Sequence, residues 1–242
     1  MISMNTSTVP VTAKASPKKG MPGVVVAKIS QLMSTPKRIY GTPAASLTWG
    51  IAGSATGDVT AGSEGEKQTA KILEAFAAKH ADVRVFHSVR WPGSKGDTDH
   101  MVVIGNHVII IDSKRWMSSR KYSVTAKGTI LRGTVPFPEG KVKMIPSLKA
   151  WREKLPTGVK LTGVISISQE KVFVPYDRNW YKAPFKLVTA ENLEEYLTKY
   201  KEKQKADTIG YIDINIIEPI ITNLIKARDR RSEIINLAAM KR

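Results

Sequence analysis

The sequence predicts an α/β domain with a mixed central β-sheet flanked by helices. Two apolar β-type segments, 97–104 and 107–114, stand side by side around a short Gly-Asn turn and predict a hairpin. Helical periodicity precedes them over 63–80 and follows them over 141–155 and 190–205. Because strands that alternate with helices favour a sheet covered by helices, we expect a layered α/β core.

Composition favours one cytoplasmic domain with appendages. The chain has 242 residues and 42% hydrophobic content, which is enough for one good-sized core. It contains no cysteine, which excludes a disulfide scaffold and fits a reducing compartment. No apolar stretch reaches the roughly 18–20 residues that span a bilayer, and the start lacks a signal-peptide pattern. We therefore expect no membrane contact.

Positive charge dominates the sequence. Lys and Arg number 38 against 21 Asp and Glu, which gives a formal net charge of +17. Residues 61–205 alone hold 26 basic and 15 acidic residues, so the core itself is basic. The charge is densest over 113–154, where Glu139 and Glu153 are the only acids. A polyanion is the expected partner, and nucleic acid is the natural candidate.

We expect the chain to have three parts. Residues 1–60 are rich in Ser, Thr, Pro, Gly and Ala and predict a basic flexible arm. Residues 61–205 hold the α/β domain. Residues 206–242 predict an amphipathic helix from near Pro219 to about Met240. Its apolar stripe packs on the core or, as an alternative, mediates self-association into a homo-oligomer.

The first helix raises a question about one acidic residue. Ser63 with Glu66 three residues later matches a capping box, which predicts that the helix begins at Ser63. Glu66 also shares the apolar face with Ala70 and Leu73. Glu66 is therefore either a capping residue or a carboxylate aimed at the sheet, where it needs a cation or a donor.

Shorter elements surround the hairpin and the helices. A loop is expected over 90–96, and strands are expected over 83–89, 121–126, 129–135, 160–168 and 171–175, the last two as a second β pair. Pro146 indicates that the helix of 141–155 starts or kinks there. Trp116 and Tyr122 stand among basic residues, which suits stacking on bases, although core packing is the commoner role.

Charged residues gather at the open end of the predicted hairpin. With the Gly-Asn pair as the turn, the numbers of facing residues sum to 211, so Asp99 faces Asp112 and Asp97 faces Lys114. Because side chains alternate along a strand, Asp112 and Lys114 share one face with the residues opposite them. All four polar side chains are therefore expected to converge.

This convergence predicts a metal site. Two ionised carboxylates whose Cβ atoms are about 4.5–5.5 Å apart repel unless a cation lies between them. Mg²⁺ or Mn²⁺ fits, since magnesium is held by one or two carboxylates plus waters and phosphate oxygens. Lys114 would then orient or help deprotonate a metal-bound water. The alternative is an ordinary cross-strand ion pair between Asp97 and Lys114.

Three ordered motifs carry a resemblance to a known family. They are Gly62-x-x-Gly65-Glu66-x-x-x-Ala70-x-x-Leu73, Asp99-His100 and Ile111-Asp112-Ser113-Lys114. The last two resemble the D…(D/E)xK signature of the PD-(D/E)XK nuclease superfamily, and all three together are similar to the NERD (nuclease-related) domain over about residues 61–155. The resemblance implies a restriction-endonuclease-like core and metal-dependent DNA cleavage that leaves 5′-phosphates. It makes Glu66, Asp99 and Asp112 metal ligands and Lys114 the catalyst, with Asp97 in reserve.

The sequence departs from the family at one supporting position. NERD-like domains commonly carry a glutamine near the start of the helix that follows the hairpin, where this chain has Lys141, Val142 and Lys143. Either lysine replaces the glutamine contact, or the function has drifted.

The sequence therefore predicts a Mg²⁺-dependent deoxyribonuclease, as an endonuclease on DNA with RNA not excluded. The alternatives are a catalytically inactive nuclease-fold protein that binds DNA, and a structural protein that assembles on a polyanionic scaffold. The residues expected to contact nucleic acid are Arg115, Arg120, Lys121, Lys141 and Lys143.

Overall fold

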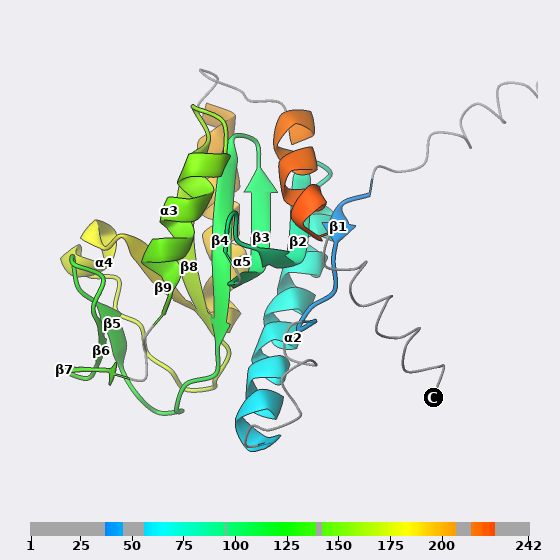
Figure 1. Cartoon of the computed structure of the whole chain (residues 1–242). Helices are drawn as coiled ribbons and strands as arrows, with labels where there is room; N and C mark the ends of the chain where they lie inside the picture. Colours follow the sequence, from blue (N-terminus) through cyan, green and yellow to red (C-terminus); the bar gives the residue numbers. More distant parts are fainter. Residues whose placement is uncertain (1–36, 46–55, 95, 139–141, 207–213, 226–242) are drawn as a thin grey trace, which may run out of the picture. The chain divides into compact units, whose positions relative to one another are not determined.

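The computed structural model describes residues 37–45, 56–94, 96–138, 142–206 and 214–225, all within the compact unit Lys37–Arg242. Its elements in chain order are β1 (Ile39–Tyr40), α2 (Thr56–Lys79), β2 (Val83–Arg90), β3 (Asp97–Ile104), β4 (His107–Lys114), β5 (Tyr122–Val124), β6 (Ile130–Arg132), β7 (Val135–Pro136), α3 (Met144–Lys154), β8 (Lys160–Ile167), α4 (Arg178–Lys182), β9 (Phe185–Thr189) and α5 (Ala190–Ala206). A helix over 214–225 follows (Figure 1).

A six-stranded mixed sheet forms the centre, in the order β1-β2-β3-β4-β8-β9. β2, β3 and β4 are antiparallel neighbours, whereas β4, β8 and β9 run parallel. The side chains of α2 and α5 pack on one face, and those of α3 and the helix over 214–225 pack on the other. Because parallel strands need apolar cover on both faces, this layering explains their continuous apolar runs. The predicted α/β class with a mixed, helix-flanked sheet is confirmed.

The register of the predicted hairpin is confirmed over 100–104 and 107–111, but the predicted pairs of Asp99 with Asp112 and of Asp97 with Lys114 do not form. Ile104 pairs with His107, and the ladder continues to His100 opposite Ile111, so facing numbers sum to 211. Gly105 takes the positive φ of 55° that the tight turn requires. All residues from His107 to Ile111 are buried. Burial of both faces therefore fixes the register that brings the two charged strand ends together.

The predicted start of the first helix is wrong. α2 begins at Thr56, seven residues before Ser63, so Ser63 lies inside the helix and the capping box does not operate. A cap stabilises a helix by only about 1 kcal/mol, and serine in a helix interior costs less than that, so the motif does not force a helix to begin there. The end of α2 at Lys79 agrees with the expected end near His80.

The second β pair is wrong as well. Segment 160–168 forms β8, but 171–175 is not a strand and contributes one bridge, between Lys121 and Phe173. Val172 and Val174 are buried while Phe173 is exposed, so the segment has the alternation of a strand, but its main-chain pairing is limited to the residues beside Lys121. β8 instead pairs in parallel with β4 and with β9, which the sequence reading missed.

A small three-stranded sheet, β5-β6-β7, holds the predicted short strands and their turn at Gly128. Tyr122 is fully buried there, and its ring centroid lies 4.9 Å from that of Trp116 and 5.5 Å from that of Phe137. These rings form part of the main apolar core. Core packing is therefore confirmed for Tyr122, whereas Trp116 is half-buried at the rim of the core.

The helix over 214–225 starts five residues before Pro219, earlier than expected. Ile217, Ile221 and Ile225 are buried in the core, which confirms that this apolar stripe packs back on the domain. The predicted continuation to Met240 lies outside the described residues, as does most of the predicted arm 1–60. Ile39 and Tyr40 from that stretch form β1, an unpredicted strand parallel to β2.

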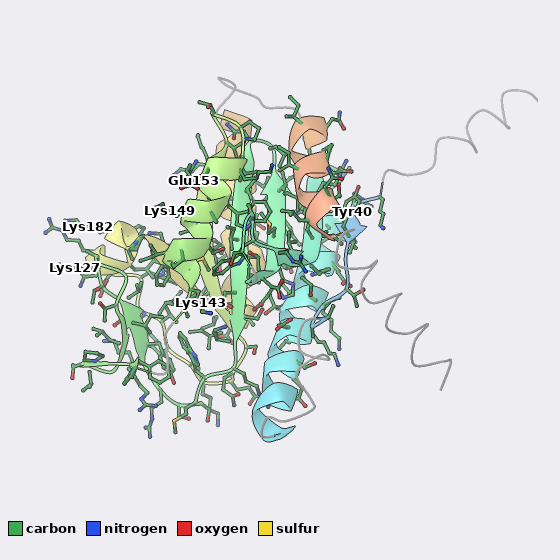
Figure 2. All side chains as sticks on the ribbon, in the orientation of Figure 1. Tyr40, Lys127, Lys143, Lys149, Glu153 and Lys182 are labelled. Carbon is green, nitrogen blue, oxygen red and sulfur yellow. The ribbon has the colours of Figure 1, made fainter. Side chains whose placement is uncertain are left out.

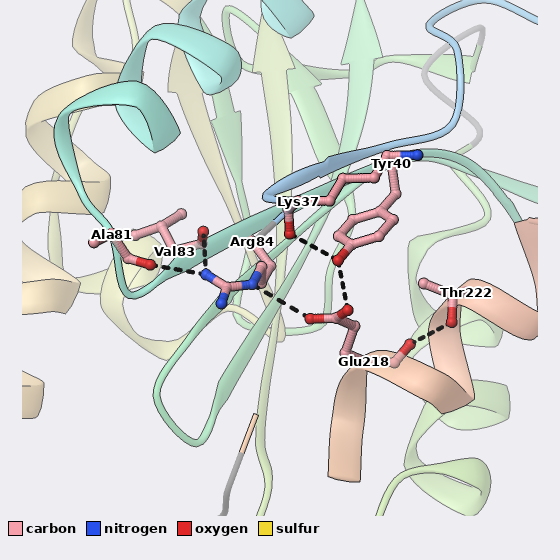
Figure 3. A network of polar contacts seen from close by, with 7 residues as sticks. All are labelled: Lys37, Tyr40, Ala81, Val83, Arg84, Glu218 and Thr222. Atoms are coloured by element: carbon pink, nitrogen blue, oxygen red, sulfur yellow. Dashed lines mark hydrogen bonds and ion pairs between the residues drawn. The ribbon is translucent and has the colours of Figure 1, made fainter. Parts of the chain in front are cut away.

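Polar contacts join β1, β2 and this last helix (Figure 3). Glu218 accepts a hydrogen bond of 2.5 Å from the Tyr40 hydroxyl and one of 3.3 Å from Arg84 Nε. Arg84 also donates to the main-chain oxygens of Ala81 and Val83. The side chain of Arg84 is only 10% exposed, so Glu218 neutralises a charge that is largely removed from water.

In the part of the chain that the structure describes, no helix is both long and apolar enough to cross a membrane.

Replacement of Glu218 tests this attachment. Glu218→Ala leaves the largely buried guanidinium of Arg84 without its carboxylate, which we expect to cost roughly 1–3 kcal/mol of unfolding free energy. The melting temperature should fall by about 2–4 °C per kcal/mol. Asn223→Ala on the exposed side of the same helix is the control and should shift it far less. Equal melting temperatures for both variants would contradict the role of Glu218.

Candidate active site

β3 and β4 separate at their charged end. Their ladder stops at His100 and Ile111, after which β4 continues beside β8 while β3 continues beside β2. Asp99 bridges the separation, because its Oδ2 accepts a 2.8 Å hydrogen bond from the Ser113 main-chain nitrogen. The side chain therefore links the strands where main-chain pairing ends, and the carboxylate sits beside the Asp-Ser-Lys motif.

β3 also changes the face of its side chains at Asp99. Thr98 accepts a hydrogen bond from Trp151 of α3, whereas His100 contacts His87, which in turn approaches Glu74 of α2. The neighbouring strand breaks its alternation at the same level, where Ser88 has a positive φ of 52°. Simple alternation, on which the sequence prediction of convergence rested, therefore fails at Asp99. It holds for Asp112 and Lys114.

Lys114 forms its ion pair within its own strand. Its Nζ lies 2.6 Å from Asp112 Oδ1 and 3.3 Å from the Ser113 carbonyl oxygen. The expected alternative, a pair between Lys114 and Asp97 across the hairpin, is not the ion pair of Lys114 in this structure. Burial by itself would lower the pKa of Lys114, but the carboxylates of Asp112, Asp99 and Glu66 outweigh it and raise that pKa. The amine is therefore an ammonium at neutral pH.

Glu66 reaches the site from α2. It is 5% exposed and shares the buried face of the helix with Ala70, Leu73 and Ala77, as its spacing predicts. Since α2 begins at Thr56, Glu66 has no capping role. Of the two predicted alternatives for Glu66, the one that remains is a carboxylate directed at the sheet.

Gly65 allows α2 to come this close. A Cβ at position 65 would lie only 2.9 Å from Ser168 Oγ and 3.6 Å from Arg115 Cβ, so glycine lets the helix touch the ends of β4 and β8. One turn further, Thr69 Oγ1 lies 3.3 Å from Ser166 Oγ. These small and hydroxyl residues hold the neighbouring Glu66 near the acids of the hairpin.

The three acids influence one another electrostatically. Burial, followed by the negative charges of Asp112 and Glu66, raises the pKa of Asp99 well above its usual range, against the opposing effect of Lys114. Carboxylates that repel in this way are stabilised by a cation. Lys114 supplies one positive charge to three carboxylates, so the cluster retains an excess of negative charge.

The donor set fits a hard divalent cation by its chemistry. Carboxylate oxygens are the preferred ligands of Mg²⁺, which needs only one or two of them from a protein. Among the described residues, however, no group of three or more His, Cys, Asp or Glu is already arranged as a metal site. Asp112 can offer both oxygens to an ion only if the Lys114 ammonium moves away from Oδ1.

A cavity of about 320 Å³ opens beside these residues. Asp97, Asp112 and Lys114 line it together with Trp91, which packs under the loop, and Lys143 at the start of α3. Figure 2 shows Lys143 at one end of α3 and Lys149 and Glu153 farther along that helix. The family glutamine is expected in this neighbourhood, so the structure puts an amine of this chain in the same cavity as Asp112.

The other predicted nucleic-acid contacts are spread over the surface. Arg115 pairs with Glu64 and with Gln169 near the α2 side of the strand ends. Arg120 is exposed, and Lys121 Nζ lies 6.0 Å from the ring of Phe173. Lys141 lies outside the described residues. Of the predicted set, Lys143 is the residue that lines the cavity of Asp112 and Lys114.

Sequence reasoning missed the supporting residues at the end of β8. Ser166 of β8 contacts Thr69 of α2, and Ser168, just after the end of β8, contacts the Lys114 carbonyl. The parallel pairing of β8 with β4 was not predicted. The Ser-Ile-Ser ending of an apolar strand was the available signal. The hydrogen bond from the Ser113 main-chain nitrogen could not be predicted from the sequence, because every residue except proline has the same main-chain donor.

Two buried histidines lie behind Asp99. The Nδ1 atoms of His87 and His100 are 2.8 Å apart, and both side chains are fully buried. One ring must donate and the other accept at this distance, so the pair is compatible with neutral rings. Burial lowers the pKa of His87 to about 4 and lowers that of His100 as well.

This burial predicts acid sensitivity of the fold. An unfolded histidine has a pKa near 6.5, so between about pH 6.5 and 4 the unfolded chain binds a proton that folded His87 does not. The free energy of unfolding should therefore fall as pH drops through this window, by roughly 1.4 kcal/mol per pH unit for His87. Urea titrations at several pH values measure the slope. His87→Gln should reduce it, and an unchanged slope would refute this origin.

The fold and the site define a class of protein. A mixed sheet with a helix glutamate, an aspartate and an Asp-x-Lys motif at adjoining strand ends is a nuclease-like α/β core. Residues 61–153 match the family model described as Nuclease-related domain, NERD, whose general placement is the PD-(D/E)XK superfamily. The family implies a nuclease-related function and a nucleic acid as partner. Neither curated proteins nor solved structures gave a match to the chain.

Proposed function

We propose that this protein hydrolyses DNA phosphodiester bonds as a Mg²⁺- or Mn²⁺-dependent endonuclease. The observation that carries the proposal is the meeting of Asp99, Asp112 and Lys114 where β3 and β4 separate, within a nuclease-related domain. The cavity beside Asp112 and Lys114 gives a phosphate access to them. The net charge of +17 favours a polyanionic substrate.

The acids have distinct roles in this proposal. Asp99 and Asp112 would hold the cation, Glu66 would bind it through a water, and Asp97 on the cavity wall is a reserve ligand. When bound, the ion would stabilise charge growing on the phosphate and lower the pKa of a water. The hydrogen bond from Ser113 keeps the Asp99 carboxylate in one orientation. By resemblance to the family, the products would carry 5′-phosphates and 3′-hydroxyls.

Lys114 acts as a hydrogen-bond donor in this scheme. Because the neighbouring carboxylates keep it protonated, it is suited to orient the attacking water and to stabilise negative charge on a phosphate oxygen. It has to leave Asp112 Oδ1 to do so. The flexible four-carbon stem of lysine permits that movement, and the side chain is one-third exposed on the cavity side.

The basic residues around the site would hold the substrate. Lys143 lies on the cavity wall and can contact a phosphate next to the scissile one. Arg115, Arg120, Lys121 and Lys141 would add contacts along the backbone. Such contacts are not base-specific, so we expect binding without strong sequence preference and with steep salt dependence.

Plasmid nicking in Mg²⁺ tests the catalytic proposal. Asp112→Asn keeps the shape of the side chain but removes its charge, and Lys114→Met removes the donor. We expect each to lower the nicking rate by about 100-fold or more, as loss of a donor that stabilises developing charge does elsewhere. Lys149→Met, an exposed lysine on α3, is the matched control and should nick like the parent. Equal nicking by all the variants, or activity that survives EDTA, would refute the proposal.

Charge reversal tests the substrate contact of Lys143. Lys143→Glu places a carboxylate in the cavity of Asp112, where it repels a phosphate, and we expect KM for a labelled duplex to rise at least tenfold. Lys143→Gln introduces the residue type of the family and should keep most of the activity. Lys149→Glu controls for the loss of net charge on the same helix. A KM for Lys143→Glu equal to that of Lys149→Glu would rule out a direct contact.

A catalytically inactive DNA-binding protein is the second candidate. Two observations favour it: Lys143 stands near the position of the family glutamine, and Lys114 occupies Oδ1 of the proposed ligand Asp112. This candidate predicts DNA binding that weakens steeply with salt, with no nicking above the EDTA control. The plasmid experiment therefore separates the two candidate functions.

The cytoplasmic location stays a prediction.

A further inference from the structure

A second cavity, of about 810 Å³, lies at the other end of the sheet. His107 and Lys160, the first residues of β4 and β8, are part of its wall. Asp112 lies five residues further along β4, which corresponds to roughly 17 Å at about 3.3 Å per residue. Apart from His107, the wall comes from residues after the segment 61–153 that matches the nuclease-related family. The cavity is therefore separate from the candidate active site.

Aromatic rings dominate this wall. Tyr176, Trp180 and Tyr181 come from α4 and the loop before it, and Tyr196 and Tyr200 come from α5. Each ring contacts another, with centroid separations of 4.9 Å for Tyr176 and Trp180, 5.1 Å for Trp180 and Tyr181, and 5.1 Å for Tyr196 and Tyr200. The ring centroids of Trp180 and Tyr196 are 6.2 Å apart, so this contact joins the two groups into one aromatic surface.

The inner rings are fixed and the outer rings are exposed. Trp180 Nε1 donates to the Leu187 carbonyl at 2.9 Å, and the Tyr196 hydroxyl donates to the Tyr200 hydroxyl at 3.2 Å. By contrast, Tyr176 is 46% exposed and Tyr181 is 69% exposed. Exposed rings that rest against a fixed tryptophan present flat surfaces to a ligand at small entropic cost.

Lysines complete the wall. Lys186 has a structural role, because its Nζ donates hydrogen bonds to the carbonyls of Trp180, Tyr181 and Ala183. Lys199 pairs with Glu195 on an open surface, where both side chains are more than 60% exposed and an ion pair contributes little. A phosphate can compete for Lys199, and the exposed Lys203 lies on the same wall.

The wall chemistry selects the class of ligand. Its residues are aromatic, basic, acidic and amide, with no Leu, Ile, Val or Met, so flat rings rather than aliphatic side chains make up its apolar surface. Rings for stacking beside amines for phosphates are the combination that binds single strands, because bases stack on aromatic side chains while basic residues contact the backbone. A duplex cannot use these rings, because its bases are already stacked.

We propose that this cavity binds unpaired nucleotides of single-stranded DNA. Bases stack on Tyr176 and Tyr181, and the backbone phosphates lie against Lys199 and Lys203. The inference rests on the proposed function in taking DNA as the partner, but it does not require cleavage. A strand that reaches both this cavity and the active site must be longer than about five stacked nucleotides, at about 3.4 Å each.

Fluorescence anisotropy with the full chain tests the cavity. The probes are labelled dT12 and a labelled 12-base-pair duplex, both in EDTA so that nothing is cut. We expect the double variant Tyr176→Ala/Tyr181→Ala to bind dT12 at least tenfold more weakly and to bind the duplex within twofold of the parent. Tyr176→Phe/Tyr181→Phe keeps both rings and should bind dT12 like the parent. Circular dichroism melting confirms that each variant is folded.

Two outcomes would overturn the proposal. One is unchanged dT12 binding by the alanine variant, and the other is an equal loss for dT12 and duplex, which would indicate a general loss of basic surface. A nicking assay on the same proteins separates this proposal from the catalytic one. If Asp112→Asn nicks like the parent while the alanine variant still loses dT12 binding, the catalytic proposal fails and the single-strand site stands.

Discussion

The hydrogen bond between the Asp99 carboxylate and the Ser113 main chain is the contact on which the site depends. It spans the point where the β3–β4 ladder ends and β3 changes faces. A continued ladder would leave no opening, and strands that parted without this contact would lose the relative position of Asp99 and Asp112. The cost of breaking the sheet is reduced locally, because the Asp99 side chain accepts the hydrogen bond of a main-chain donor that has lost its partner on β3.

The second constraint is the closeness of α2. Glycine at position 65 and hydroxyl residues on facing elements allow this helix to touch the strand ends, which brings Glu66 into the field of the hairpin acids. The apolar residues of α2 fix its rotation, since Leu73, Phe76 and Ala77 are buried on the sheet. The chemistry of the site is thus positioned by packing that begins two turns away from it.

Sequence reasoning succeeded where a residue pattern has one structural meaning. The two buried apolar strands and their Gly-Asn turn fixed the 211 register, and helical spacing placed Glu66 on the buried face. It failed where the local sequence pattern is right for an element but the pairing partner is set by the rest of the fold. Segment 171–175 alternates like a strand but forms one bridge, between Phe173 and Lys121, instead of the predicted pair with 160–168, and Ser63 looks like a cap inside a continuing helix. Lys114 pairs with Asp112 rather than Asp97. This depends on the place where the side chains of β3 change face, at the level of Asp99 and of Ser88 with its positive φ.

The topology of the sheet sets the smallest piece of this protein that can exist alone. The segment 61–153 that matches the family ends before β8, yet β8 pairs with the whole length of β4, carries Ser166 and is followed directly by Ser168. A fragment cut at the family boundary would present β4 as a bare apolar edge, the kind of surface that recruits other chains into aggregates. Expression of a folded unit therefore calls for a segment that extends past the family boundary, so that β8, β9 and the final helix are included with the rest of the core.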